Sequence, residues 1–292
     1  MKKILFLGSL LVLASGLYFF TIGDYHQTKQ FSLDNMLSHH AHNPKWDVHP
    51  VSSQEESNIH SILNRNFKYI GCGNQIYVFF SEDNKYVLKI VKQHRYTVPR
   101  WIRYLVPSVL SYRTKKIGHK EHSLERDFNS YKIAFDLLKE ETGLHFVHLN
   151  SHDNFHHNLT LIDKSNVEYK VDLHDYEFVL QDMADMVLPT IDKHMAHGDI
   201  TSAKAAIDSL LNLQYVRCKK GIHDSDPNFD KNFALINNKA VQIDVGRFSL
   251  KTPETFPNIK EEFKNHLHKF PELEEYYDAQ YLAYSEKYAQ SI

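Results

Sequence analysis

The sequence predicts an α+β fold in which short antiparallel strands precede a mainly helical region. Three short runs rich in β-branched and aromatic residues, 67–70, 76–80 and 86–91, are joined by short polar turns and predict three antiparallel strands. A second pair of runs, 232–235 and 241–246, flanks an Asn-Asn turn and predicts a hairpin. Apolar residues recur at helical spacing in segments between and after these strands.

Composition excludes several classes of protein. The 292 residues are 42% hydrophobic and 13% aromatic, and 34 Lys and Arg accompany 36 Asp and Glu, which excludes disordered, collagen-like and coiled-coil chains. Cys72 and Cys218 are too few for a disulfide framework and lie in no Cys-x-x-Cys spacing. The 20 histidines follow no metal-ligand period. The length allows one or two domains with a substantial core.

The N-terminus, residues 1–22, is predicted to be a transmembrane anchor or a signal sequence. Lys2 and Lys3 precede an apolar run, 4–22, which at about 1.5 Å per residue can just cross a hydrocarbon layer of about 30 Å. A cleaved signal peptide is the alternative, although residues 17–20 extend the run beyond a usual signal-peptide core. Because positively charged residues tend to stay in the cytoplasm, the two lysines favour a position of the remaining chain on the opposite side of the membrane, with the cytoplasmic side as the alternative.

A tether is expected at residues 23–51, which are polar and rich in histidine. Ser53 and Glu56 then form a capping-box pattern that predicts a short helix. The folded domain is therefore expected to begin near residue 52.

A basic segment, 92–120, contains eight of the 34 Lys and Arg and no acidic residue. This charge, with aromatic residues interspersed, favours an anionic surface such as a membrane. A solvated loop packed on the sheet region is the alternative. Nucleic acid is not expected as a partner, because the positive charge is confined to this segment.

Gly71 and Gly73 lie in the turn that follows the first predicted strand. Glycines let backbone N–H groups approach a phosphate chain closely, and Lys89 on the third strand could place its ammonium group over the same phosphates. Because hairpins also use glycine for purely conformational reasons, this turn alone does not establish a phosphate site.

Oxygen donors flank the C-terminal hairpin. Asn232 opens its first strand and Asp244 ends its second, so the hairpin brings two hard oxygen ligands side by side. Such a pair suits Mg²⁺, which combines one or two protein ligands with phosphate oxygens and water. Just upstream, Asp224 and Asp226 lie in a loop where a carboxylate could orient a nucleophilic hydroxyl group.

The N-terminal part of this pattern resembles the protein kinase-like superfamily. Gly71, Gly73 and Val78 match the glycine-rich loop of that family, with Ile76 in place of its third glycine. The segment 87–89 looks like the family's strand motif that ends in lysine.

The C-terminal part extends the resemblance. The sequence Asp244-Val245-Gly246 is similar to the metal-binding D-F-G motif, and Asp244 follows Asn232 by twelve residues, close to the family's interval. The resemblance covers roughly residues 65–250. It is nearer to atypical bacterial kinases, such as lipopolysaccharide or antibiotic phosphotransferases, than to eukaryotic protein kinases. It implies a two-lobe kinase-like fold, with a small antiparallel-sheet N-lobe at 52–181 and a mainly helical C-lobe at 182–292.

The resemblance also implies roles for the strand lysine and a helix carboxylate. Lys89 would hold the α and β phosphates of ATP and pair with a glutamate of the next helix, expected at 123–135. Glu125 is the chosen partner, and Glu121, one turn earlier, is the alternative. Either could instead be an ordinary solvated carboxylate.

Ligand-binding residues follow from the same resemblance. Gly71, Gly73 and Val78 would cover the nucleotide. Backbone groups near Gln181 and Met183 would meet the adenine edge. The metal ligands for Mg²⁺ would be Asn232 and Asp244.

The catalytic aspartate that the resemblance implies is displaced in this chain. The family places it five residues before the asparagine, where this sequence has Phe229. Asp226, six residues before the asparagine, is predicted to be catalytic, with Asp224, eight residues before it, as a second carboxylate or a substitute.

A second candidate motif, His197-Gly198-Asp199, resembles the catalytic loop of antibiotic phosphotransferases. Five residues after the aspartate stands Lys204 rather than asparagine. Asp199 or Thr201 is therefore predicted to cap a helix.

The predicted function is a membrane-anchored phosphotransferase that depends on ATP and Mg²⁺ and phosphorylates a hydroxyl group. An inactive pseudokinase that binds a nucleotide or a partner is one alternative, favoured by Ile76, by the displaced aspartate and by an outward topology away from ATP. A non-enzymatic cell-envelope protein, whose glycines and aspartates are only turn residues, is the other.

Overall fold

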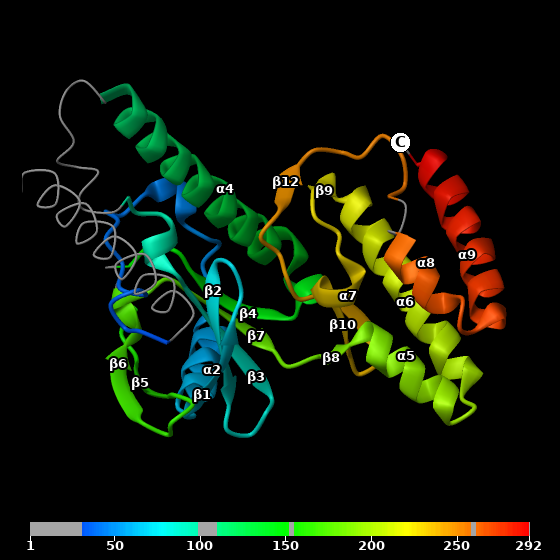
Figure 1. Ribbon diagram of the computed structural model, residues 1–292, viewed down its shortest axis with the longest axis horizontal. Helices are drawn as coiled ribbons and strands as arrows, with labels where there is room; N and C mark the ends of the chain where they lie inside the picture. Colours follow the sequence, from blue (N-terminus) through cyan, green and yellow to red (C-terminus); the bar gives the residue numbers. More distant parts are fainter. Residues whose placement is uncertain (1–30, 99–109, 152–154, 258–260, 292) are drawn as a thin grey trace, which may run out of the picture.

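The computed structural model describes residues 31–98, 110–151, 155–257 and 261–291. These residues form a mixed α/β structure with two parts, a sheet half and a helical half, that lie side by side (Figure 1). The long helix α4 (Leu110–Thr142) contacts elements of both.

The sheet half is built on one sheet with the strand order β4-β7-β3-β2-β1-β5-β6. The strand bounds are β1 Phe67–Cys72, β2 Ile76–Ser81, β3 Tyr86–Val91, β4 Leu144–His148, β5 Asn158–Ile162, β6 Glu168–Asp172 and β7 Phe178–Asp182. Neighbouring strands are antiparallel except β1 and β5, which are parallel. The three antiparallel strands predicted from the β-branched and aromatic runs are confirmed.

Helix α2 (Ser53–Leu63) packs its apolar side on the core of this sheet. Its N-cap is Ser52, whose side chain accepts from the Glu55 N–H while the Glu55 carboxylate accepts from the Ser52 N–H. The capping box predicted at Ser53 and Glu56 is therefore wrong by one residue. The reason is that two consecutive serines precede two consecutive glutamates at the required spacing, so the pattern fits both registers.

The tether expected at 23–51 is wrong for residues 31–51, which pack against the sheet half. Met36 is fully buried, and the Trp46 ring lies edge-on to Phe128 with ring centroids 4.9 Å apart. Isolated apolar residues in a polar stretch are enough to attach it, because each buries a large side chain. The remainder of the expected tether lies outside the described residues.

Helix α4 contains the helix predicted at 123–135 and is much longer. Residues 110–120, which the sequence places in a basic segment before the helix, form its first turns. Residues 99–109 of that segment lie outside the described residues. Short 3₁₀ helices occupy η1 Pro44–Trp46, η2 Gln93–Arg95 and η4 Leu173–Asp175.

The helical half follows β7. Its elements are β8 Asp185–Met186, α5 Val187–Ala196, α6 Ile200–Lys219, β9 Ile222–Asp224, α7 Phe229–Asn232, β10 Phe233–Ile236, β11 Lys239–Gln242, β12 Phe248–Leu250, α8 Glu261–Leu267 and α9 Pro271–Ala289. The predicted hairpin is confirmed as β10 and β11, whose turn residues Asn237 and Asn238 have the positive φ values of 50° and 65° that a two-residue hairpin turn requires. Asp199 caps α6, as predicted, by accepting from the Ser202 N–H at 3.0 Å.

In the described part of the chain, no helix combines the length and the apolar character that crossing a membrane requires. The anchor expected at 4–22 lies outside these residues.

Candidate active site

One small cavity contains residues from three distant parts of the sequence. Its volume is about 130 Å³, and it is lined by Asn74, Gln75, Asp224, Asp226, Asn232, Asp244, Gly246 and Arg247. The glycine turn after β1 thus meets the loop before β10 and the segment after β11. The volume is below the roughly 300–1,000 Å³ typical of pockets that enclose a small molecule.

Asn232 and Asp244 are held side by side by the hairpin. Asn232 ends α7, and its carbonyl oxygen accepts from the Ile243 N–H at 2.7 Å. The side-chain amide nitrogen of Asn232 donates to the Asp226 carbonyl oxygen at 2.9 Å, so the amide oxygen is the atom that could bind a cation. The Asp244 side chain is exposed, and its Oδ1 accepts from the Gly246 N–H at 3.2 Å.

The donors of this pair are two hard oxygen atoms, one from an amide and one from a carboxylate. Among the described residues, no group of three or more His, Cys, Asp and Glu side chains is placed to hold a metal ion. An amide oxygen and one carboxylate fit Mg²⁺, which takes few protein ligands and completes its shell with phosphate oxygens and water.

Lys89 contacts the backbone of the residue that precedes Asp244. Its Nζ donates to the carbonyl oxygen of Ile243, the residue before Asp244, at 2.5 Å and to Gln181 Oε1 at 2.6 Å. Burial lowers the pKa of Lys89 to about 8, and the negative charge of Asp244 opposes this shift. The structure therefore brings the Lys89 ammonium group to the residue before Asp244, and Asp244 shares a cavity with Asn232.

The two candidate catalytic aspartates occupy different environments. Asp224 is buried, and its Oδ2 accepts from Gln242 Nε2 at 2.6 Å and pairs with Arg217 Nη1 at 3.3 Å. Its Oδ1 accepts from the backbone N–H of Asp226 at 2.9 Å. Asp226 is exposed at the cavity. Both aspartates line the cavity, but Asp224 is buried and bonded to the loop, whereas Asp226 is exposed.

Hydrogen bonds from Gly73 and to Gly73 fix the glycine turn to the start of β2 and to Lys92, which follows β3. Gly73 N–H donates to the Ile76 carbonyl oxygen at 3.0 Å, and Lys92 Nζ donates to the Gly73 carbonyl oxygen at 2.9 Å. A methyl group placed on Gly71 would meet no atom within 4 Å, so the space beside it is open. Val78 pairs with Gly71 on one side and with Lys89 on the other, which places it between the turn and the lysine.

The expected pairing of Lys89 with Glu125 is wrong. The Glu125 carboxylate pairs with Lys45 Nζ at 3.2 Å, and 56% of its side-chain surface is exposed. Glu121 does not replace it, because Glu121 and Glu125 both line a different cavity of about 650 Å³ that also includes Lys45. The physical reason is that neither glutamate belongs to the buried stripe of α4.

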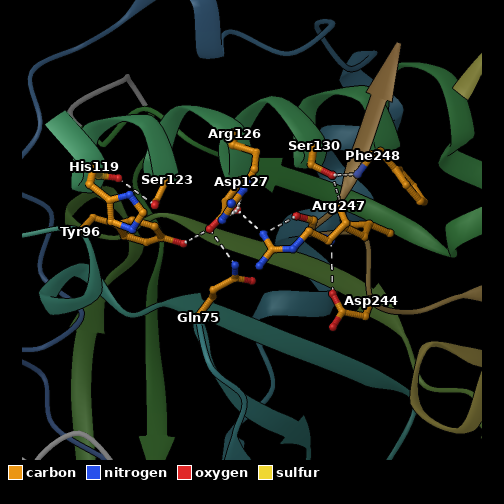
Figure 2. Close-up of polar contacts among 12 residues, drawn as sticks. Gln75, Tyr96, His119, Ser123, Arg126, Asp127, Ser130, Asp244, Arg247 and Phe248 are labelled. Atoms are coloured by element: carbon orange, nitrogen blue, oxygen red, sulfur yellow. Dashed lines mark hydrogen bonds and ion pairs between the residues drawn. The ribbon is translucent and has the colours of Figure 1, made fainter. Parts of the chain in front are cut away.

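The carboxylate of α4 that faces the site is Asp127. Its side chain is 1% exposed and accepts from Gln75 Nε2 at 2.7 Å, Tyr96 Oη at 2.9 Å, Arg247 Nη1 at 2.8 Å and Arg126 Nε at 3.0 Å (Figure 2). It therefore connects the glycine turn to the residue that follows Asp244-Val245-Gly246.

A sequence signal for Asp127 exists. It lies three residues after Leu124 and four before Tyr131, so it falls within the apolar stripe of the predicted helix. A charged residue at such a position must be paired when the stripe is buried, and the paired group then marks a site or a structural network. For Gln75 and Arg247, no comparable pattern in the sequence indicates a role.

Helix α4 also fixes the segment after Asp244. The Ser130 hydroxyl donates to the Val245 carbonyl oxygen and accepts from the Phe248 N–H, the latter at 2.6 Å (Figure 2). Both contacts are buried, so the chain at 245–248 is held against the helix.

The segment expected to meet the adenine edge has several hydrogen bonds within the protein. The Gln181 side chain is buried; its Oε1 accepts from Lys89 and its Nε2 donates to the Thr142 carbonyl oxygen. The Met183 N–H donates to the Lys85 carbonyl oxygen at 2.8 Å, and the Asp182 N–H donates to the Gly143 carbonyl oxygen at 2.9 Å. Two N–H groups that were expected near the adenine edge are therefore engaged within the protein, because β7 continues its pairing past its end.

Among known proteins, similarity to this chain is found in solved structures. No protein-family model matches the chain, and no curated protein matches it. Solved structures of the bifunctional kinase-methyltransferase WbdD are similar to it with TM-scores of 0.33 and 0.32 and 17% sequence identity, including one in complex with a kinase inhibitor. The similarity covers 74–75% of this chain and 43–44% of the WbdD chains, so this chain spans less than half of their length.

Proposed function

We propose that this protein is a phosphotransferase of two-lobe kinase-like fold that uses ATP and Mg²⁺ to phosphorylate a hydroxyl group. The observation that carries the proposal is that the Lys89 ammonium group donates to the carbonyl oxygen of Ile243, the residue before Asp244, while Asp244 lines one cavity with Asn232 and Asp226. In this proposal the sheet half is the N-lobe and the helical half is the C-lobe.

Each residue has a distinct task in the proposed reaction. Lys89 neutralises charge on the nucleotide phosphates, and the two oxygens of Asn232 and Asp244 hold Mg²⁺, which supplies further charge neutralisation. Asp226 orients the acceptor hydroxyl group and accepts its proton. Asp224 keeps the loop of Asp226 in place through its hydrogen bonds.

Attachment to a membrane through 4–22 or through the basic segment 92–120 stays a prediction from the sequence. Nucleic acid is not part of the proposal.

A pseudokinase that binds a nucleotide without chemistry is the second candidate. It is favoured by the pairing of Lys89 with the Gln181 amide in place of a helix carboxylate, and by the engagement of the Met183 N–H. In this candidate the same cavity binds phosphate and Mg²⁺, but transfer to a hydroxyl group does not occur.

The test is titration of the full-length protein with ATP in the presence and absence of Mg²⁺, followed by measurement of ATP turnover. We expect Asp244→Ala to abolish Mg²⁺-dependent binding and turnover. The matched control is Asp230→Ala, which removes an exposed carboxylate of α7 that does not line the cavity. Full Mg²⁺-dependent turnover in Asp244→Ala would refute the proposal, whereas binding without turnover in the wild type would select the pseudokinase.

A further inference from the structure

The charges around the cavity are unbalanced. Asp224, Asp226 and Asp244 contribute three carboxylates, and among the described residues that line the cavity, Arg247 is the one with a positive charge. Lys89 is not among the lining residues, and its hydrogen bonds go to Gln181 and to the Ile243 carbonyl. A phosphoryl group that enters this cavity would therefore meet Arg247 as the cation of the lining.

Arg247 is held in one orientation from the side of α4. Its Nη1 donates to Asp127 Oδ1 at 2.8 Å and to the Gly246 carbonyl oxygen at 3.3 Å (Figure 2). Because a guanidinium group carries five N–H donors in a planar fork, one nitrogen can bind a carboxylate while others bind phosphate oxygens. The Asp127 carboxylate itself is fixed by burial and by its other donors.

The glycine turn is part of the same arrangement. Gln75 donates to the second oxygen of Asp127, and a methyl group on Gly246 would approach Gln75 Oε1 to 3.1 Å. Asp127 thus holds the tip of the turn and Arg247 together at the cavity.

We propose that Arg247 is a catalytic residue that binds the phosphoryl group during its transfer, and that Asp127 is the residue that positions it. This inference rests on the proposed phosphotransferase function. In that reaction the acceptor oxygen bonds to the γ-phosphorus as the bond from this phosphorus to the β,γ-bridging oxygen breaks. The hydroxyl proton passes to Asp226, and the nucleoside diphosphate leaves with the electrons of the broken bond.

Arg247 would stabilise the negative charge on the equatorial oxygens of the phosphoryl group during its transfer. Charge-assisted hydrogen bonds from a guanidinium group to phosphate oxygens are among the stronger interactions in proteins. Their effect is largest when the donor is already oriented, because no reorganisation accompanies the reaction.

Arg126 provides a matched control. Its Nη2 pairs with the same oxygen of Asp127, at 2.9 Å, but its side chain is 44% exposed and it does not line the cavity. Loss of Arg126 removes one partner of Asp127 without removing a cavity cation.

The experiment is equilibrium titration of the full-length protein with Mg²⁺-ADP, alone and with aluminium fluoride, which mimics a phosphoryl group in transfer. In the wild type we expect aluminium fluoride to increase ADP affinity. In Arg247→Gln this increase should fall by about 10- to 100-fold, the size of a hydrogen bond between charged groups, with ADP affinity itself within about twofold. Arg126→Gln should retain the full increase.

We expect Arg247→Gln to fold, because the buried Asp127 carboxylate still accepts hydrogen bonds from Gln75, Tyr96 and Arg126 in this variant. Arg247→Lys, which retains the charge without the planar fork, should show a partial loss. Asp127→Asn should reduce the fluoride-dependent increase by a larger factor than it reduces ADP affinity, a separation that a merely structural role would not produce.

The outcomes distinguish the two proposals. A wild type that does not bind Mg²⁺-ADP refutes the phosphotransferase and this inference with it. If aluminium fluoride increased ADP affinity equally in Arg247→Gln and Arg126→Gln, the role of Arg247 would be overturned. The same holds if the wild type bound ADP but aluminium fluoride did not increase its affinity. Neither outcome would refute the proposed phosphotransferase.

Discussion

Lys89 Nζ lies 2.6 Å from Gln181 Oε1, so a neutral amide on β7 accepts from this ammonium group. The other acceptor is the carbonyl oxygen of Ile243. Neither partner carries a full negative charge, so these two hydrogen bonds of Lys89 go to neutral acceptors.

Replacing Lys89 separates binding from stability. In Lys89→Met we expect affinity for Mg²⁺-ATP to fall at least tenfold, because the charge beside Asp244 is lost. The free energy of unfolding should change by no more than about 2 kcal/mol, since removal of a buried charge offsets the loss of two hydrogen bonds. Calorimetry and urea unfolding measure the two effects, with the exposed Lys85→Met as the control. Unchanged affinity would contradict the phosphate-binding role.

The two loop aspartates should respond in opposite ways. Asp224→Asn leaves the buried Arg217 without its anionic partner, so the free energy of unfolding should fall by about 3–5 kcal/mol. Asp226→Asn alters an exposed side chain, so stability should stay within about 0.5 kcal/mol while ATP turnover falls by about 100-fold or more. Urea unfolding and a turnover assay on both variants check this. Stable Asp224→Asn protein together with fully active Asp226→Asn protein would reverse the assignment.

Glu177 should make stability depend on pH. Burial raises its pKa from 4.5 to about 7, although Ser38 and Gln93 donate hydrogen bonds to the carboxylate. Between these two pH values the folded protein binds a proton at Glu177 that the unfolded chain does not bind. The contribution of Glu177 to the free energy of unfolding is therefore fully present below pH 4.5 and is lost as the pH rises to about 7. The difference corresponds to a change on the order of 3 kcal/mol.

Glu177→Gln should remove this decline, because the amide does not titrate. Urea unfolding at pH 5, 6, 7 and 8 measures the slope, and the exposed Glu168→Gln on β6 is the control that should keep the wild-type slope. The same pH dependence in Glu177→Gln and in the wild type would show that another group is responsible.

Local sequence chemistry predicted several elements correctly. The Asn237-Asn238 turn, the Asp199 cap and the first three strands each depend on residues close together in the chain, whose conformational preferences act before any packing. Errors arose where a local pattern had two solutions, as with the capping boxes at Ser52 and Ser53.

The candidate site shows the same division. Lys89, Asn232 and Asp244 could be selected because each belongs to a strand or turn with a recognisable pattern. The pairing of Lys89 with Glu125 was wrong, because Glu125 lies on the exposed face of α4 and pairs with Lys45, whereas Asp127, two residues later, lies in the buried stripe and pairs with Arg247.

The amino-acid sequence by itself determined the first three strands and the hairpin with its turn, because these depend on neighbours within a few positions. Only the tertiary structure decided that Lys89 contacts Gln181 and that Asp127 joins Gln75 to Arg247. Such contacts depend on which face of α4 packs against the sheet. They also depend on which partners a polar group can reach once it is buried. Separation along the chain carries no information about either.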